Sequence, residues 1–176
     1  MNMAGGRDIN SIADLYREFY QSIFRYLYRL SGSSQAAEDL TQDTFCQAVL
    51  SVHRFRGDSK VSTWLFKIAR NLYLNYQRNA DRDRRLQRMH LKETGAERWE
   101  TPHAALERQE LSHRVQEILS NLPEDFRSVI ILKEVEKMSH NEIAQVLDKT
   151  VTSTKVLLHR AKKKFREEYR RLEGNI

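Results

Sequence analysis

The side chains that could carry out acid–base, nucleophilic or metal chemistry are few in this sequence, and their spacing does not support such chemistry. The acidic pairs Glu134/Glu136 and Glu167/Glu168 have no partnered base, so we interpret them as solvated charge. The single cysteine, Cys46, cannot form an internal disulfide, which is typical of a reducing cytoplasm. None of the six histidines stands at a metal-ligand spacing from a cysteine or another histidine, and the six glycines are scattered. The sequence therefore favours a protein with no catalytic activity, cofactor or metal ion.

Basic residues that could bind a polyanion are concentrated near the C-terminal end of the chain. From residue 149 to residue 166 there are seven Lys or Arg residues and no Asp or Glu. Two amphipathic segments, at about 139–147 and 152–172, are separated by a tight turn and have the spacing of a helix-turn-helix, whose second helix enters the major groove of DNA. The face turned away from the core consists of Thr152, Ser153, Val156, Arg160 and Lys163, flanked by Lys155 and His159. The alternative is a solvated basic helix without a ligand.

A second basic region, from residue 53 to residue 78, mixes positive charge with aromatic rings. It contains six Lys or Arg residues and one Asp. A helix there places on one outward stripe Trp64, Lys67, Asn71, Asn75 and Arg78. Aromatic planes combined with cations suit unstacked bases, so the region is a candidate for binding single-stranded nucleic acid. Alternatively the rings are packed, which we expect for Phe66 and Tyr73, whereas Trp64 is open to either interpretation.

The segment 35–51 has a different character, because its outward stripe is acidic at one end and apolar at the other. The stripe consists of Asp39, Gln42, Asp43, Cys46 and Leu50. Acidic groups on a basic protein are a poor surface for nucleic acid and a reasonable one for another protein. The alternative is a solvated face with a half-buried cysteine.

The elements that must position these surfaces are indicated by apolar residues that recur about every 3.6 positions. In the first half of the chain the pattern predicts helices over 12–30, 35–51 and 62–78. The inward face of the third consists of Val61, Leu65, Ile68, Ala69, Leu72 and Tyr76. In the second half, helices are predicted from Thr101-Pro102 to Leu122 and onward from Pro123. Ser139 and Glu142 form a capping box, and we expect Thr152 to cap the last helix, which has Thr154 in its core stripe.

Few turn-forming residues and a charged middle segment define the fold class. Six Gly and two Pro in 176 residues exclude a many-turned sandwich or barrel, so we expect an all-α protein. We assign residues 8–79 and 105–173 to two small helical domains. Residues 80–104 carry few apolar side chains and are predicted to be a polar linker, with at most transient helix.

Net charge and hydropathy limit the environment and the partners. Thirty Lys plus Arg against twenty-four Asp plus Glu give a net charge of +6, which favours a polyanionic partner. A hydrophobic content of 40% is enough for a core. The N-terminal ten residues contain no apolar signal region, and the longest aliphatic run, Val129 to Leu132, is four residues. We therefore expect a cytoplasmic protein that neither is secreted nor spans a membrane.

Five segments in this order resemble the extracytoplasmic-function (ECF) sigma factors of bacterial RNA polymerase, in the sigma-70 superfamily. They are Ala-Glu-Asp-Leu-Thr-Gln-Asp-Thr-Phe (37–45), Phe-Arg-Gly-Asp (55–58), Ser-Thr-Trp-Leu-Phe-Lys-Ile-Ala-Arg-Asn (62–71), Leu-Pro-Glu-Asp-Phe-Arg (122–127) and Leu-His-Arg-Ala-Lys-Lys-Lys-Phe (158–165). The similarity spans nearly the whole chain. It implies a helical bundle like sigma region 2, followed by a C-terminal helix-turn-helix like sigma region 4.

The resemblance also implies a role for each surface. A polymerase set would contact the clamp coiled coil of the largest core subunit: Asp39, Gln42 and Asp43. A −10 set would lie at or near the melted non-template strand of the −10 element: Arg54, Arg56, Lys60, Ser62, Thr63, Trp64, Lys67, Asn71 and Asn75. A −35 set would read the −35 element as duplex: Thr152, Ser153, Lys155, Val156, His159, Arg160 and Lys163. The linker would thread toward the active-site and RNA-exit channels.

The sequence departs from the family pattern in the helix-turn-helix. Asp148 occupies a turn position where the family commonly has Gly. Within 151–157, Thr154 replaces a core valine and Leu157 replaces an arginine. Duplex binding is therefore predicted, but no particular −35 sequence is.

Two functions from different classes follow. The first is an alternative sigma factor that binds core polymerase, directs promoter-specific initiation and is controlled by an anti-sigma factor, a protein that in this family is often membrane-bound. The second is a stand-alone helix-turn-helix repressor. Such a repressor would normally be a dimer, and no segment looks like a dedicated dimerisation helix.

Overall fold

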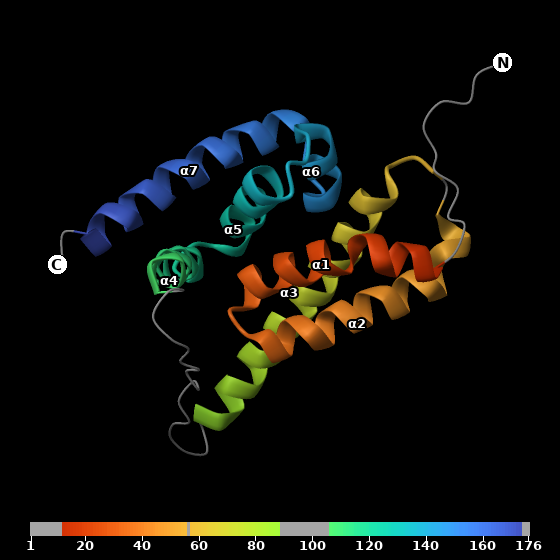
Figure 1. The fold of residues 1–176 in the computed structure, drawn as a ribbon, viewed down its shortest axis with the longest axis horizontal. Coiled ribbons are helices and arrows are strands. Elements are labelled where there is room, and N and C mark those ends of the chain that lie inside the picture. The colour runs from red at the N-terminus through yellow and green to blue at the C-terminus, as the bar shows by residue number, and fades with distance from the viewer. Residues whose placement is uncertain (1–11, 56, 89–105, 174–176) are drawn as a thin grey trace.

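The computed structural model describes residues 12–55, 57–88 and 106–173, and within these ranges every regular element is a helix (Figure 1). The first half contains α1 (Ile12–Ser31), α2 (Ser34–Ser51), the short 3₁₀ helix η1 (Val52–Arg54) and α3 (Val61–Arg88). The second half contains α4 (Leu106–Ser120), α5 (Glu124–Ile130), η2 (Ile131–Val135), α6 (His140–Leu147) and α7 (Val151–Glu173). We call these halves the N-terminal and C-terminal bundles. The all-α class is confirmed.

The core of the N-terminal bundle lies where α1, α2 and α3 meet. Its fully or nearly fully buried members are Ile23, Tyr26, Leu27, Leu30, Ala37, Leu40, Phe45, Ala48, Leu65, Phe66, Ala69 and Tyr73. Phe66 and Tyr73 are therefore packed, as predicted. Tyr76, predicted to face inward, continues the buried stripe of Leu65, Ala69 and Tyr73 but is 43% exposed, because α3 there extends past the surface against which it packs. Gly32 ends α1 in the left-handed conformation (φ +71°) that favours glycine.

In the C-terminal bundle, the middle helix (α5 with η2) packs against α6 and α7, and α1 of the N-terminal bundle covers another side of it. Ile131 and Leu132 are both fully buried although they are sequence neighbours, because other helices cover both sides of η2. The backbone of η2 has π-helical hydrogen bonding, with the Glu136 N–H donating to the Ile131 carbonyl at 3.1 Å. This one-turn π segment was not predicted.

The ends of α6 and α7 test the predicted caps. Ser139 and Glu142 form the predicted capping box, with hydrogen bonds in both directions. The cap of α7 is Thr150 rather than Thr152: the Ser153 N–H donates to the Thr150 hydroxyl at 3.1 Å, and the helix begins at Val151. The buried Thr154 satisfies its hydroxyl by donating to the Thr150 carbonyl at 3.0 Å. A threonine therefore fits a core position there.

The helix α3 is longer than the sequence pattern indicated. It continues to Arg88, ten residues past the predicted end at 78 and into the segment predicted as linker. Arg, Leu and Gln in that segment are good helix formers, so it extends the helix without an apolar face. Residues 89–104 of the predicted linker lie outside the described residues.

The two bundles pack directly against each other. In Figure 1, α6 lies beside the first part of α3, and both α3 and α1 contact the C-terminal bundle. The Tyr26 and Ser128 hydroxyls are 2.9 Å apart within the shared interface. Arg127 and Tyr73 both donate to the Leu30 carbonyl at 2.8 Å. The hydrophobic core is therefore continuous from one bundle to the other.

Candidate nucleic-acid and protein-binding surfaces

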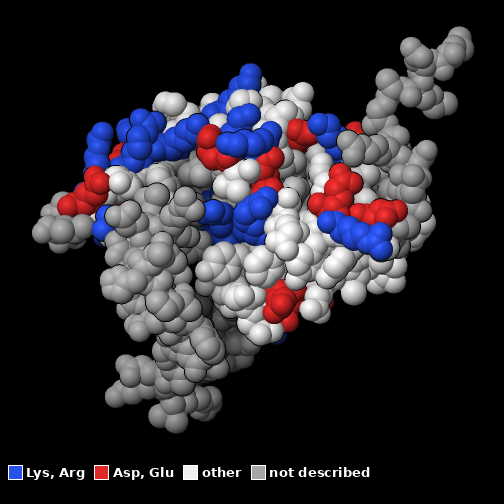
Figure 2. Space-filling view, viewed as in Figure 1, with Lys and Arg blue, Asp and Glu red and all other residues white. Residues whose placement is uncertain are grey.

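The first half of α7 presents all seven residues of the −35 set to solvent. The opposite face buries Thr154, Leu158 and Ala161 against the C-terminal bundle. The fold therefore turns α7 as the helical pattern predicted. Figure 2 shows Lys and Arg side chains following this helix along one edge of the molecule.

A shallow groove of about 330 Å³ runs between α5 and α7 and includes part of the −35 set. Its walls are formed by Phe126, Lys149, Thr152, Ser153, Val156, Leu157 and Arg160. Phe126 and Lys149 were not predicted as site residues, because their position beside α7 depends on how α5 packs. Lys149 also forms an ion pair of 3.0 Å with Asp125 at the start of α5. The groove thus combines apolar walls with two cationic groups.

The −10 set lies along η1, the following loop and the first half of α3. Arg54, Lys60, Asn71 and Asn75 are exposed, and Ser62, Trp64 and Lys67 are half-buried. The Trp64 ring packs against Phe55 with 5.0 Å between ring centroids. Thr63 is only 1% exposed, and its hydroxyl has no hydrogen-bond partner. Arg56 lies outside the described residues.

Two lysines of the −10 set are paired with carboxylates of the C-terminal bundle. Lys60 forms an ion pair of 2.8 Å with Glu142 of α6. Lys67 pairs with Asp148, the residue that ends α6 in the left-handed conformation (φ +51°). Burial of Glu142 opposes its charged form, but hydrogen bonds from Lys60 and Ser139 outweigh that effect and lower its pKa to about 2.

Arg70 of α3 is the centre of a more buried polar network that the sequence did not reveal. It donates to both carboxylate oxygens of Glu124, at 3.0 and 2.8 Å, and to Asp125 at 2.6 Å. Burial disfavours the charged form of Asp125, but Lys149 and Arg70 outweigh it and lower the pKa of this carboxyl. Ser128 links Glu124 to Tyr26. Sequence spacing cannot pair residues more than fifty positions apart.

The outward face of α2 has the predicted combination of acid and apolar surface. All three residues of the polymerase set are exposed, and Gln35 donates to Asp39 at 3.1 Å. Cys46 is exposed rather than half-buried. Leu50 is 70% exposed at the apolar end. Because these side chains are exposed in the structure, a protein partner can reach this face of α2.

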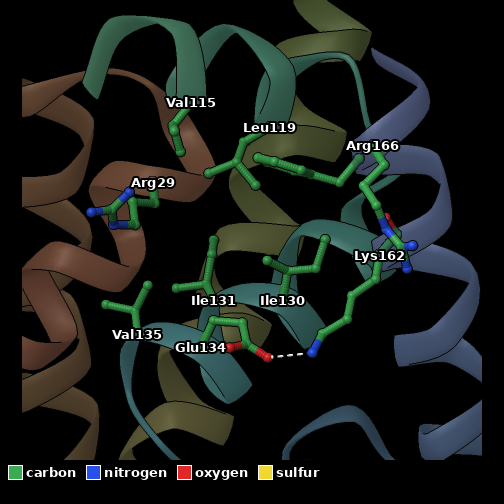
Figure 3. Close-up of a pocket in the computed structure, with 10 residues that line it drawn as sticks. Arg29, Val115, Leu119, Ile130, Ile131, Glu134, Val135, Lys162 and Arg166 are labelled. Atoms are coloured by element: carbon green, nitrogen blue, oxygen red, sulfur yellow. Dashed lines mark hydrogen bonds and ion pairs between the residues drawn. The ribbon is translucent and has the colours of Figure 1, made fainter. Parts of the chain in front are cut away.

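An apolar groove of about 310 Å³ lies between α4, η2 and α7 (Figure 3). It is lined by Arg29, Val115, Leu119, Ile130, Ile131, Glu134, Val135, Lys162, Phe165 and Arg166. At its edge Glu134 and Lys162 form an ion pair of 2.7 Å, whose hydrogen bond lowers the pKa of Glu134 although burial opposes this. Sequence reasoning missed the groove because its wall is formed by residues of five separate elements, α1, α4, α5, η2 and α7.

No cluster of three or more His, Cys, Asp or Glu side chains in residues 12–55, 57–88 and 106–173 is placed to hold a metal ion. Within the same ranges, no helix combines the length and the apolar character that crossing a membrane requires.

Comparison with known proteins matches both bundles to a single family. The model of Sigma-70 region 2 matches residues 15–83, and that of Sigma-70, region 4 matches residues 112–165. The chain is 36% identical over 156 residues to the RNA polymerase sigma factor YlaC of Bacillus subtilis (strain 168), covering 87% of this chain and 88% of that protein. It is 30% identical over 172 residues to the ECF RNA polymerase sigma factor SigW of the same strain, covering 94% and 92%.

Two solved structures share the fold. One is the sigma factor RpoE in complex with the anti-sigma factor NepR from Bartonella quintana, with a TM-score of 0.71 and 24% identity over 89% of this chain and 97% of that one. The other is CnrH in complex with the cytosolic domain of CnrY, with a TM-score of 0.66 and 23% identity over 89% and 85%. Both likenesses concern the arrangement of helices.

Proposed function

Because the chain belongs to the extracytoplasmic-function sigma factors of bacterial RNA polymerase, we propose that its three surfaces divide promoter recognition among them. As a member of that family it is an alternative sigma factor, which binds core polymerase and directs transcription initiation at promoters. The polymerase set makes the protein contact, the −10 set holds opened DNA and the −35 set holds duplex DNA. The supporting observation is that the polymerase set is acidic and lies on α2, whereas the two DNA sets are basic and lie elsewhere, one along η1, the following loop and α3, and the other on α7.

The −35 contact uses the groove beside α7. Arg160 is long enough to reach a guanine edge or a phosphate, and the Val156 side chain is apolar, as contact with a thymine methyl requires. Phe126 adds apolar surface to the wall of the groove, and Lys149, in the same wall, offers a charge for a phosphate. Thr152 and Ser153, next to the N-terminus of α7, add hydroxyl donors where the helix dipole attracts anions.

The polymerase contact uses α2. Asp39 and Asp43 lie one helical turn apart and face solvent, so a basic partner helix can pair with both. Cys46 and Leu50 continue the same stripe with apolar surface. The acidic end of this stripe on α2 attracts a basic partner during association. The apolar end adds surface area that is removed from water on binding.

The −10 contact uses the first half of α3. Trp64 offers a ring on which a base can stack, and Lys67 and Lys60 offer charge for the strand backbone. Two weak DNA contacts on separate bundles reinforce each other, because binding of one raises the effective concentration of the other.

An anti-sigma protein controls this sigma factor in our proposal. The support is the shared fold with RpoE, solved with the anti-sigma factor NepR, and with CnrH, solved with the cytosolic domain of CnrY. A tagged chain isolated from its own host should carry core polymerase in one fraction and a smaller protein in another. Recovery of polymerase alone under every growth condition would count against an anti-sigma partner.

A run-off transcription assay with purified core polymerase and candidate promoters tests the main proposal. The unaltered chain should give promoter-dependent product and co-purify with core. The double variant Asp39→Ala/Asp43→Ala should lose both, whereas the control Glu117→Ala, an exposed acid on α4, should keep both. Tight duplex binding by the chain alone, without transcription or co-purification, would favour the repressor instead.

A further inference from the structure

Arg78 shares the outward stripe of α3 with Trp64, Lys67 and Asn75, although it is not part of the −10 set. Its side chain is exposed, and two hydrogen bonds hold its guanidinium along the helix. One is donated to the Leu74 carbonyl at 3.4 Å, and the other is donated to the side-chain oxygen of Asn75. Arg78 therefore acts directly on a side chain of the −10 set.

The hydrogen bond to Asn75 determines which way that amide points. A guanidinium has only donors, so only the oxygen of the amide can face it. The amide nitrogen lies on the opposite side of the same planar group, and its N–H donors are turned away from Arg78. An unrestrained asparagine offers both a donor and an acceptor to a ligand. Asn75 in this pairing offers donors alone.

We propose that Arg78 is a positioning residue for the −10 surface. Because it occupies the amide oxygen of Asn75, that side chain favours a keto base, thymine or guanine, over adenine or cytosine in the opened strand. The role assigned to Arg78 rests on the proposed function, since α3 must lie against the melted strand, and it deepens that function by naming the class of base selected.

The selection follows from the hydrogen-bonding groups of the bases. Thymine O4 and guanine O6 accept hydrogen bonds, whereas adenine and cytosine carry an amino donor at the corresponding position. Asparagine recognises adenine with both ends of its amide, because the oxygen accepts from the amino group and the nitrogen donates to N7. When its oxygen is bound to Arg78, Asn75 cannot accept from that amino group. Two donors that face each other leave both unsatisfied, which costs free energy.

The position of Asn75 on α3 separates it from the ring on which a base can stack. Eleven residues of helix, about 16 Å along the axis, lie between Trp64 and Asn75, so the two side chains meet different bases. Arg78 then has two effects that can be measured separately. Its charge attracts the phosphates of any strand, whereas its hydrogen bond to Asn75 changes the preference for one base over another.

Heteroduplex promoters with an unpaired −10 segment test the proposal with the holoenzyme. Each non-template position of the segment carries A, C, G or T in turn, and competition binding measures the relative affinity for each base. Asn75→Ala first identifies the position at which base preference depends on this side chain. There the unaltered chain should prefer thymine or guanine to adenine by about fivefold or more, as expected of one directed contact.

Three variants and a control then isolate the effect of Arg78 on that preference. Arg78→Ala should reduce it to about twofold or less, because the released amide can rotate and accept from adenine. Arg78→Lys keeps a cation that only donates and should retain most of it. Asn75→Asp offers acceptors alone and should reverse it toward adenine or cytosine. The control Arg82→Ala removes an exposed arginine one turn further along α3 and should weaken binding to all four bases alike.

A base preference that is unchanged in Arg78→Ala, or that falls equally in Arg82→Ala, would overturn the positioning role. The absence of any position at which Asn75→Ala alters the preference would overturn it as well. Failure of the underlying function gives a different result. Lys67→Ala should reduce transcription from a fully paired promoter, and if it does not, the −10 role of α3 fails. If it does while Arg78→Ala keeps the preference, only the role of Arg78 fails.

Discussion

Arg70 in α3 and Glu124 at the start of α5 are joined by two parallel hydrogen bonds of 3.0 and 2.8 Å, across the boundary between the two bundles. The fork of the guanidinium matches the two carboxylate oxygens, which adds geometric specificity to the strength of the ion pair. Glu124 also lies in the first turn of α5, where the helix dipole favours a negative charge. The relative placement of the bundles therefore depends strongly on one arginine.

Replacing Arg70 should destabilise the folded chain. Arg70→Ala leaves Glu124 buried without its partner, and breaking a buried pair in this way costs about 3 kcal/mol or more. Denaturant unfolding followed by circular dichroism measures the loss. The control Arg17→Ala removes an exposed arginine of α1 and should cost at most about 1 kcal/mol. Similar losses for the two variants would contradict a structural role for Arg70.

Lowering the pH should reduce the free energy of unfolding, in part because Glu142 becomes protonated. Its pKa is about 2 in the folded chain against 4.5 for an ordinary glutamate, so the folded state binds fewer protons. The stability from this group is complete above about pH 4.5 and is lost as the pH falls toward 2. Unfolding titrations at several pH values should show a shallower acid loss for Glu142→Gln than for the unaltered chain. If the free energy of unfolding falls equally with pH in both proteins, Glu142 does not contribute to the acid sensitivity of the fold.

Modification of Cys46 should report the polymerase contact. The thiol is exposed on the outward stripe of α2, so a maleimide should react quickly in the free protein and slowly when core polymerase is bound. As a control, an excess of the Cys46→Ser variant should occupy the core and restore the fast rate. If the rate is the same with and without core, Cys46 lies outside the interface.

Arg160 should matter more for duplex binding than a neighbouring cation on another face. It lines the groove with Phe126, whereas Lys164 pairs with Glu168 at 3.3 Å on the same helix. Arg160→Ala should weaken holoenzyme binding to a promoter duplex by about 1–3 kcal/mol, and Lys164→Ala should weaken it less. Filter binding or anisotropy at fixed salt measures both. Equal effects would indicate general charge attraction rather than a placed contact.

Local signals in the sequence predicted much of the fold. The capping box of Ser139 and Glu142 was found because both partners lie within one helical turn. The outward face of α7 followed from helical rotation, as did the burial of Thr154. The cap at Thr150 was missed because two threonines within three positions offer the same chemistry, and only the backbone path selects one.

The sequence pattern could not predict contacts between residues that are far apart in the chain. Arg70 belongs to a helix whose apolar stripe was predicted, yet its partners are 54 and 55 positions away. Tyr76 was assigned to the inward face because it continues a helical spacing, but α3 extends past the end of the surface it packs against. Such errors arise where packing between helices, rather than periodicity, decides burial.

The π-helical turn at Ile131–Val135 affects how this chain can change in length during evolution. In a regular α turn, deleting one residue rotates the following segment by about 100°. A π turn holds one more residue than an α turn, so a deletion there can convert it to an α turn and leave the segments on either side in place. Glu136, which follows the turn, would then keep its partner Arg25. We therefore expect relatives to lose a residue here more readily than in the α-helical turns before it.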